Sequence, residues 1–409
     1  MDKYLRTQEI LNKFDLSRQT LYRWIRDKEI SEPTRDWRNW RQWTEENVKE
    51  IQNLINNKIE TQTDTTKVKK VFFEVNNRRY LGSKYKLLDF ITSTVKENCT
   101  GINSVADIFG GTGVVANKFN QQGKKIIVND LLLSNYYSYL TWFASEEVDI
   151  KKISRYITEF NNKECNLDNY VSNNFGGTYF TINNARKIGY VREKINVLKR
   201  KKQINGREEA ILITVLIYAM DKVANTCGHY DAYRRKLDST EEIKLLIPHL
   251  TKIENNKNNS IYMRDANELV KEIYADLVYI DTPYNSRQYG DAYHLLENIA
   301  EWKKPKVEGV AKKMVNRGKT KSLYCTSKAP EAFQDLIQNI NAKYILVSYN
   351  NMAQKGVGRS NAKISNEEII SILEQRGKVQ VFSTDYKVFT TGNTNINDHK
   401  ELLYLCKCR

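Results

Sequence analysis

The sequence predicts an α/β protein in which helices cover a mostly parallel sheet and a small helical unit comes first. Strand and helix patterns alternate from residue 103 onward, which is typical of a parallel sheet. Aspartates at 130, 265 and 281 fall at expected carboxyl ends of strands, where such sheets bind their ligands. Residues 1–60 show three short helical patterns, and the polar residues 61–70 are expected to form a linker.

The chain is strongly basic, with 65 lysine and arginine residues against 49 acidic residues and a net charge of +16. Such a balance usually means a polyanionic partner, and nucleic acid is the first candidate. Half of the excess lies in residues 303–328, which hold nine basic residues and one glutamate, a net of +8. Solvent exposure would explain why this segment is polar, but it would not explain why nearly all of its charges are positive. We therefore expect a phosphate-contacting loop that includes Lys312 and Lys313.

The composition argues against a membrane protein and against a metal site. No apolar run is long enough to span a bilayer and the chain starts without a secretory signal, so we expect a cytoplasmic protein. The six cysteines and four histidines are dispersed and contain no C-x-x-C pair. Structural zinc and a disulfide framework are therefore not expected.

Helical patterns in residues 1–60 follow one another closely. RTQEILNKF and LSRQTLYRWI are separated by about three residues, and a third helix follows Thr44 after an aromatic, arginine-rich stretch. This arrangement resembles the winged helix-turn-helix of MerR-like regulators and excisionases, although protein-docking modules also show three-helix patterns. On the helical spacing, Leu21, Trp24 and Ile25 form the core. The resemblance implies that DNA is contacted by Arg18, Gln19 and Arg23.

A glycine-rich turn follows the apolar strand expected at 105–109, and a helix begins near Val114. The glycines at 110, 111 and 113 would let the backbone approach a ligand closely. The next strand ends at Asp130, where a carboxylate can hold the hydroxyls of a ribose. These features together favour an adenosine-containing cofactor. This turn does not contain the Gly-Lys-Ser/Thr of a P-loop, which disfavours a nucleoside triphosphate.

Six short motifs occur in an order and spacing that resemble alpha-class DNA adenine methyltransferases, the group of the Dam methylases and FokI-type modification enzymes. They read RRYLGSK, DIFGGTG, VND, YMRDANEL, YIDTPYNSRQY and YILVSYNN, and the resemblance covers residues 71–409. It implies a Rossmann-like methyltransferase sheet that binds S-adenosylmethionine. The family's pattern also implies which residues contact the cofactor. Tyr80 and Lys84 would hold its methionine end, and Phe109, Gly111 and Gly113 would line its adenosine. Asp130 would hold the ribose and Asp265 the adenine ring, while Asp281 would lie between the cofactor and the target base.

The DTPY motif, Asp281 to Tyr284, is interpreted as a clamp on a planar amine. Turn formation explains each residue separately, whereas a clamp explains all four together. The Asp281 carboxylate and the Thr282 carbonyl can hold the hydrogens of the amine and point its lone pair at the methyl group. Pro283 stiffens that carbonyl, and Tyr284 offers a ring for the base to stack on. Many relatives have proline in place of Thr282, but only the backbone carbonyl is needed.

The resemblance also divides the second part of the chain. Residues 71–134 and 259–409 would form the methyltransferase domain, and residues 135–258 a helical target-recognition insertion. The remaining strands are expected at 342–350, 378–389 and 401–407, with a helix capped by Ser365 and stopped by Gly377. Candidates in the insertion for base or phosphate contacts are Arg186, Lys187, His229, Tyr233, Arg234 and Arg235.

The predicted function is site-specific transfer of a methyl group from S-adenosylmethionine to the N6 amine of adenine in double-stranded DNA. It implies a restriction-modification system with a cognate restriction endonuclease as partner. Two alternatives remain. The first is a methyltransferase for cytosine N4 or for an amine in RNA, because the same clamp would serve any planar amine. The second is a MerR-like transcription regulator, which would explain residues 1–60 but would leave the later motifs as coincidence.

Overall fold

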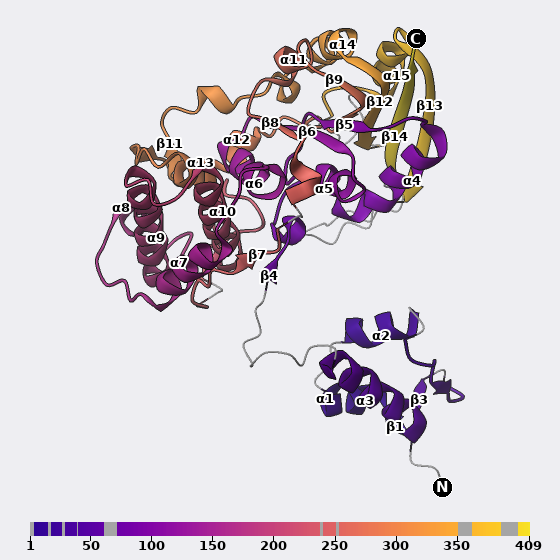
Figure 1. The fold of residues 1–409 in the computed structure, drawn as a ribbon, viewed down its shortest axis with the longest axis vertical. Coiled ribbons are helices and arrows are strands. Elements are labelled where there is room, and N and C mark those ends of the chain that lie inside the picture. The colour runs from indigo at the N-terminus through magenta and orange to yellow at the C-terminus, as the bar shows by residue number, and fades with distance from the viewer. Residues whose placement is uncertain are drawn as a thin grey trace. The chain divides into compact units, whose positions relative to one another are not determined.

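The computed structural model describes residues 4–14, 18–26, 29–38, 40–60, 72–237, 240–250, 253–350, 362–385 and 400–409. The chain forms two compact units, residues 1–69 and residues 70–409 (Figure 1). Each unit has its own hydrophobic core.

The first unit contains three helices and a small antiparallel sheet. The helices are α1 (Thr7–Phe14), α2 (Arg18–Arg26) and α3 (Glu45–Glu60), as the sequence predicts. The strands β1 (Leu5–Arg6), β2 (Thr34–Arg35) and β3 (Arg41–Trp43) pair in the order β1-β3-β2. Thr44 caps α3, because its hydroxyl accepts the N–H of Asn47. Leu21 and Trp24 are buried in the core and Ile25 packs against it, which confirms the expected core face of α2.

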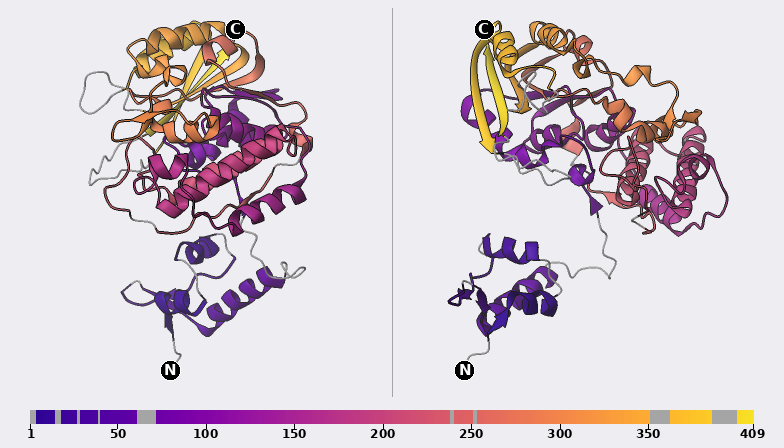
Figure 2. Two further views of the ribbon diagram at one scale, coloured as in Figure 1. Left: turned by 90° about the vertical axis from the view of Figure 1, so that its left-hand side faces the viewer. Right: turned by 180° about the vertical axis from the view of Figure 1, so that it is seen from behind.

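The second unit is built on a seven-stranded sheet with the order β13-β14-β12-β9-β5-β6-β8. Its strands are β5 (Ser104–Asp107), β6 (Lys125–Asn129), β8 (Ser260–Tyr262), β9 (Tyr274–Ile280), β12 (Asn341–Asn350), β13 (Gly377–Asp385) and β14 (Lys400–Cys408). Pairing is parallel from β8 to β12, whereas β14 runs antiparallel to both of its neighbours. This confirms the prediction of a mostly parallel sheet. Figure 2 shows β13 and β14 at one edge.

Both faces of the sheet are buried, because alternate strand residues enter two separate cores. Val105 and Leu277 face a core shared with α4 (Leu88–Asn98), α5 (Val114–Gln121) and α6 (Leu133–Phe143). Ala106 and Val278 face the other core, formed with α11 (Ala266–Leu269), α14 (Ala329–Asn339) and α15 (Asn366–Glu374) (Figure 1). The sheet is therefore the middle of three layers.

The region expected as an insertion is mainly helical. It holds α7 (Ile150–Asn162), α8 (Tyr170–Phe175), α9 (Ile182–Arg200) and α10 (Gly206–Val223), and its strand β7 (Ile247–Pro248) pairs with β4 (Phe72–Phe73). Buried residues of α7 to α10 belong to the same core as one face of the sheet. The helical character is as predicted, but the region shares the compact unit of the sheet.

The chain between β9 and β12 contains α12 (Tyr289–Ala292), α13 (His294–Glu301), β10 (Val307–Glu308) and β11 (Lys313–Met314). Short 3₁₀ turns are η1 (Val75–Asn77), η2 (Lys84–Leu87), η3 (Ile253–Asn256), η4 (Gly318–Thr320) and η5 (Leu323–Cys325). Within the described ranges, no helix is both long and apolar enough to cross a bilayer. The same residues contain no group of three or more His, Cys, Asp or Glu that could hold a metal ion.

The helix before β13 ends differently from the prediction. Ser365 caps α15 as expected, since its hydroxyl accepts the N–H of Glu368. The helix ends at Glu374, however, and Gly377 is the first residue of β13. A Cβ at Gly377 would lie 1.9 Å from the carbonyl oxygen of Lys407, so this glycine is required by strand pairing and does not stop the helix.

Candidate active site

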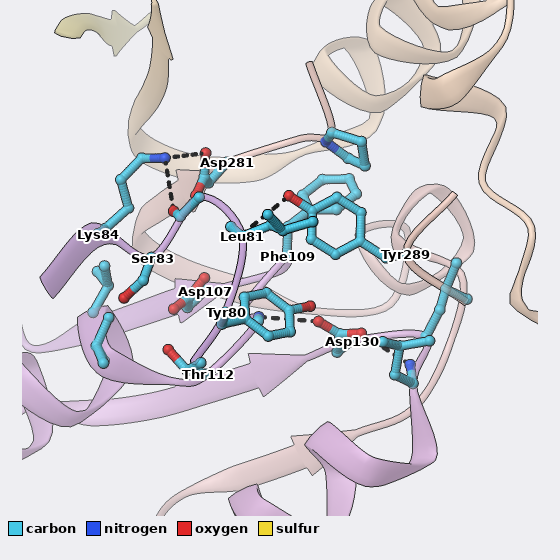
Figure 3. A pocket seen from close by; sticks show the side chains of 18 of the residues that line it. Tyr80, Leu81, Ser83, Lys84, Asp107, Phe109, Thr112, Asp130, Asp281 and Tyr289 are labelled. Carbon is cyan, nitrogen blue, oxygen red and sulfur yellow. Dashed lines mark hydrogen bonds and ion pairs between the residues drawn. The ribbon is translucent and has the colours of Figure 1, made fainter. Parts of the chain in front are cut away.

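A pocket of about 770 Å³ opens at the carboxyl ends of β5, β6 and β9, the edge where a parallel sheet binds its ligands. Asp281 and Lys84 lie at one end of the pocket, Asp130 lies at the other, and Asp107 lies between them (Figure 3). The pocket is therefore lined by three carboxylates from three neighbouring strand ends.

The glycine turn between β5 and α5 presents bare backbone to the pocket. Gly111 has φ +53° and Gly113 has φ +80°, which lie in the left-handed region that favours glycine. Gly110 has no space for a side chain, because a Cβ there would lie 2.7 Å from the Tyr139 hydroxyl. That hydroxyl donates to the carbonyl of Gly111 at 2.8 Å and holds the turn in place. A ligand can thus approach the backbone closely.

Asp130 follows β6 directly, and backbone groups fix both of its oxygens. Oδ2 accepts the N–H of Gly111 at 3.0 Å, and Oδ1 accepts the N–H of Leu132 at 2.9 Å. Each carboxylate oxygen can accept a second hydrogen bond. Asp130 therefore has both the orientation and the remaining acceptor capacity to hold two hydroxyl groups.

Tyr80 forms a wall of the pocket and is held by an aromatic stack. Its ring lies parallel to that of Tyr293, with centroids 4.6 Å apart, and the Arg78 guanidinium lies 5.4 Å from its ring centre. The Asn135 amide donates to its hydroxyl at 3.2 Å. The ring covers Gly111 so closely that a Cβ there would come within 3.0 Å of it. Tyr80 and the glycine turn thus form one rigid surface.

Asp107 lines the pocket at the end of β5, and the sequence interpretation gave it no role. It is 1% exposed, and its Oδ1 has no hydrogen-bond partner among the described residues. Burial, together with the negative charge of Asp281, raises the pKa of Asp107 to about 8. A buried carboxylate with an open oxygen is stabilised by a positively charged partner. This part of the pocket therefore suits a cationic group.

Asp281 directly follows β9 and belongs to a tight cluster of polar groups. Its Oδ1 lies 2.9 Å from the Lys84 ammonium and accepts the Tyr284 hydroxyl at 2.6 Å. Lys84 also donates to the Tyr284 hydroxyl at 2.5 Å and to the Gly82 carbonyl at 3.3 Å. Both contacts of Asp281 use the same oxygen. Oδ2 has no partner in the part of the chain that the structure describes, so it can accept a hydrogen bond from a substrate.

The other residues of the DTPY motif differ in their surroundings. Thr282 is 2% exposed, whereas Pro283 lines the pocket. Tyr284 turns its hydroxyl into the Asp281 cluster, and its ring meets that of Tyr349 at 66° with centroids 4.7 Å apart. Its role as a stacking surface for the base stays a prediction. The structure adds a further role, which is to fix one oxygen of Asp281.

Not all of the implied cofactor contacts line the pocket. Phe109 and Gly111 do so, but Gly113 and Asp265 are not among the lining residues. Gly113 caps α5, and Asp265 accepts two backbone N–H groups at the start of α11. Lys84 lines the pocket, yet its ammonium already contacts Asp281, Tyr284 and a backbone carbonyl. A contact of Lys84 with the methionine end of the cofactor stays a prediction.

Two candidates for DNA contacts in the insertion have internal partners. Arg186 forms an ion pair with Asp168 at 2.8 Å. Lys187 donates to the carbonyls of Asn161 and Lys163 at 2.7 and 2.6 Å. Both residues thus tie α9 to the end of α7 and the chain that follows it, and their contacts with DNA stay predictions.

Two other candidates meet at Asp231. Its carboxylate lies 2.8 Å from Nζ of Lys313, 3.7 Å from Nε of Arg287 and 3.9 Å from Nδ1 of His229. Burial and the positive charge of Arg287 lower the pKa of His229. This group joins the insertion, the chain after the DTPY motif and the basic segment 303–328.

The remaining candidates have varied surroundings. The Tyr233 ring packs on Tyr179 with centroids 5.1 Å apart. The side chains of Arg18, Arg234 and Arg235 are exposed. The side chains of Gln19 and Arg23 lie outside the described residues.

The basic segment 303–328 is folded and partly neutralised. It contains β10, β11, η4 and η5, which differs from the simple loop expected. Five of its nine basic side chains form ion pairs with acidic residues: Lys303, Lys304, Lys306, Lys313 and Arg317. Thr320 and Ser322 line the pocket, and Lys319 and Lys321, which are next to them in the chain, are exposed. Neither lysine has an acidic partner among the described residues.

Three residues of the site were missed by sequence reasoning. Asp107 had a recognisable signal, since it ends an apolar strand just before the glycine turn. Tyr289, whose hydroxyl donates to the Leu81 carbonyl at 3.3 Å, is the last residue of the YIDTPYNSRQY motif, but the motif gave it no role. Glu401 contacts Lys84 and Tyr284 from β14 and had no local signal.

The chain belongs to the family of D12 class N6 adenine-specific DNA methyltransferases, whose model matches residues 80–356. This match includes the glycine turn, Asp130, the helical insertion and the DTPY motif. It does not include the first unit or the last two strands of the sheet.

Curated relatives show the same relationship. The chain is 36% identical over 347 residues to modification methylase StsI of Streptococcus sanguinis, covering 80% of this chain and 51% of the relative. It is 34% identical over 324 residues to type II methyltransferase M.FokI of Planomicrobium okeanokoites, with coverage of 74% and 48%. Type II methyltransferase M.NlaIII of Neisseria lactamica is 31% identical over 333 residues, with coverage of 78% and 95%. The chain thus spans about half the length of the StsI and FokI methylases and nearly all of M.NlaIII.

Proposed function

We propose that this chain transfers a methyl group from S-adenosylmethionine to the N6 amine of adenine at specific sites in double-stranded DNA. The observation that carries the proposal is the Oδ2 of Asp281, which accepts no hydrogen bond from the described residues, beside the pocket that the glycine turn and Asp130 line. Membership of the N6 adenine-specific family supports adenine as the target.

The donor groups of the pocket fit S-adenosylmethionine. Asp130 can hold the two ribose hydroxyls, and the bare backbone of the glycine turn allows the adenosine to approach. Asp107 and Asp281 offer carboxylates to the positively charged ammonium and sulfonium groups. When bound, the cofactor supplies an electrophilic methyl group. The protein contributes position and charge around it.

The DTPY motif would orient the amine of the target base. The lone pair of this amine is delocalised into the ring, so the amine alone is a poor nucleophile. Asp281 Oδ2 and the carbonyl of Thr282 can each accept one N–H, which turns the lone pair toward the pocket. Lys84 and Tyr284 hold the other oxygen of Asp281, and this keeps the carboxylate from rotating. Pro283 restricts the backbone that carries the second acceptor.

The target base must leave the duplex to reach this clamp, because N6 is inaccessible within stacked DNA. Lys319 and Lys321 are suited to hold the flanking phosphates, since they are exposed beside Thr320 and Ser322 at the rim of the pocket. Arg287 and Lys313 lie beside the helical insertion, where Asp231 limits their movement. We infer that the insertion and the basic segment bind the DNA around the extracted base.

We further propose that the first unit is a MerR-like winged helix-turn-helix that binds DNA. α1 and α2 follow each other closely, and β2 and β3 form a hairpin after them. Near the end of this hairpin, Trp37 and Trp40 are 86% and 57% exposed, and the Arg38 guanidinium lies 4.4 Å from the Trp37 ring centre. Exposed aromatic and arginine side chains on a hairpin suit a groove or a phosphate backbone.

The names of the relatives support a place in a restriction-modification system, in which this chain would protect sites from a cognate endonuclease. The test is mass spectrometry of nucleosides from DNA and from RNA incubated with the protein and isotope-labelled S-adenosylmethionine. We expect labelled N6-methyladenine from DNA. Labelled N4-methylcytosine would show that cytosine is the target, and label in RNA alone would show that RNA is the substrate. A complete lack of label would contradict the proposal.

A further inference from the structure

Glu401 is a buried carboxylate beneath the Asp281 cluster, and the proposed methyl transfer does not yet use it. It lies on β14 and is 5% exposed. Its Oε1 accepts the Ser348 hydroxyl at 2.9 Å and lies 3.2 Å from the Tyr284 hydroxyl and 3.5 Å from the Lys84 ammonium. Lys84 and Tyr284 are also the two partners of Asp281. The two carboxylates therefore share both partners.

This sharing decides how strongly Asp281 can attract a substrate. A hydroxyl has one proton, so Tyr284 can donate to only one of the two carboxylates at a time. The positive charge of Lys84 is likewise divided between Asp281 and Glu401. Without Glu401, Asp281 would have the full charge of Lys84 and the hydroxyl proton of Tyr284 to itself. Its remaining oxygen would then be a weaker acceptor for the target amine.

The charges in the cluster do not cancel. Lys84 faces two carboxylates, and burial raises the pKa of Glu401, with Lys84 lowering it and Asp281 raising it. The other titratable groups near Glu401 are Tyr284, after β9, and Tyr279, on β9. From β12 its contact is the neutral Ser348. Protonation of either carboxylate therefore changes the charge that the other one experiences.

We propose that Glu401 is a positioning residue, which shares Lys84 and Tyr284 with Asp281 and so keeps Asp281 a strong acceptor for the target amine. This inference rests on the proposed methyl transfer. Glu401 acts through Lys84 and Tyr284 and does not itself touch the substrate. It has to be ionised to do so.

The variant Glu401→Gln tests this role, because it keeps the size of the side chain and removes its charge. We expect kcat for adenine methylation to fall roughly tenfold to a hundredfold, the scale of a misplaced catalytic group, while KM for DNA stays within about twofold. The acid limb of the kcat profile should move to lower pH, since a neighbouring negative charge favours protonation of a carboxylate. Lys84→Met should move this limb to higher pH, because it removes the positive charge of the cluster.

Glu297→Gln is a matched control. Glu297 is also buried, and its pKa is raised by burial, but it accepts the N–H groups of Leu133 and Ser134 away from the Asp281 cluster. We expect its acid limb to stay at the wild-type position. If the acid limb of the kcat–pH profile of Glu401→Gln stays at the wild-type pH or moves to higher pH, this inference is overturned and the proposed function is not. A wild-type protein that forms no N6-methyladenine would overturn the proposed function and this inference with it.

A second measurement needs neither cofactor nor DNA. A carboxylate with a raised pKa in the folded state contributes stability below its unfolded pKa of about 4.5, and this stability is lost as the pH rises through the folded value. The unfolding free energy of the wild type should therefore decrease relative to that of Glu401→Gln as the pH rises above about 4.5. Parallel curves for the two proteins would mean that Glu401 is not the coupled, buried group that the inference requires.

Discussion

The substitution Asp107→Asn should remove the pH dependence of cofactor binding. With a pKa of about 8, Asp107 is ionised in about 1% of ligand-free molecules at pH 6 and in about 10% at pH 7. A positively charged cofactor binds the ionised form, so the apparent affinity of the wild type should rise about tenfold between pH 6 and 7. Binding should release close to one proton. The amide of the Asp107→Asn variant carries no charge at either pH, so this variant should bind more weakly and with little pH dependence.

Isothermal titration of S-adenosylmethionine into the protein at pH 6.0, 6.5 and 7.0 measures both quantities. Two buffers of different ionisation enthalpy give the number of protons released. This range lies below the pKa of a free α-amino group, so the charge of the cofactor itself changes little. A wild-type affinity that is constant from pH 6 to 7, with no proton release, would refute the assignment of Asp107 as the partner of a cationic ligand.

Replacing Lys319 and Lys321 by alanine should weaken binding to all DNA sequences about equally and give a shallower dependence on salt, as measured by fluorescence anisotropy at several salt concentrations. The matched pair Lys303→Ala and Lys304→Ala, whose ammonium groups already have glutamate partners, should have the smaller effect, and the reverse order would contradict the proposed rim. Deleting residues 1–69 should leave a folded unit that methylates the same sequence with a higher KM for DNA. A changed pattern in sequencing of methylated sites would place part of the specificity in the first unit.

The parts of the site that depend on neighbouring residues could be predicted from the sequence. Asp130 and Asp281 each follow an apolar strand, and parallel strands bring their carboxyl ends to one edge. In the turn, Gly111 and Gly113 have positive φ angles, and Gly110 has a close contact with Tyr139 that leaves no space for a side chain. These features need no knowledge of distant partners, because the local strand, turn and helix determine them.

Contacts between distant segments could not be predicted. Glu401 meets Tyr284 across 117 residues, because β14 inserts between β12 and β13. Nothing in the local sequence indicates which strand will occupy that place. The same limit applies to Lys187, whose ammonium group donates to two backbone carbonyls that the local sequence does not indicate, and its contact with DNA stays a prediction. A basic side chain in a sequence can bind a phosphate or stabilise a helix end, and only its neighbours distinguish the two.

The orientation of the Tyr284 hydroxyl is another feature that could not be predicted from the sequence. The motif predicts an aromatic ring beside the target base, and this expectation considers the ring without its hydroxyl. In the structure the hydroxyl contacts Asp281, Lys84 and Glu401. Burial and two nearby carboxylates raise the pKa of Tyr284 well above its usual value, so the hydroxyl stays protonated and can donate at any pH used for assay.

The proposed clamp is tested most directly by single-turnover methyl transfer to adenine with Asp281→Ala beside the wild type. Binding of S-adenosylmethionine and of DNA should be measured on the same two proteins. We expect the variant to stay folded, because Asp281 lies after the strand and contributes little to the core. It should still bind DNA, and it should bind S-adenosylmethionine more weakly because one of the two pocket carboxylates offered to its positive groups is lost, so transfer is compared at saturating cofactor. Transfer should fall by more than about a hundredfold, the scale for loss of a principal transition-state contact. A variant that keeps more than about a hundredth of the wild-type rate would contradict the clamp at Asp281.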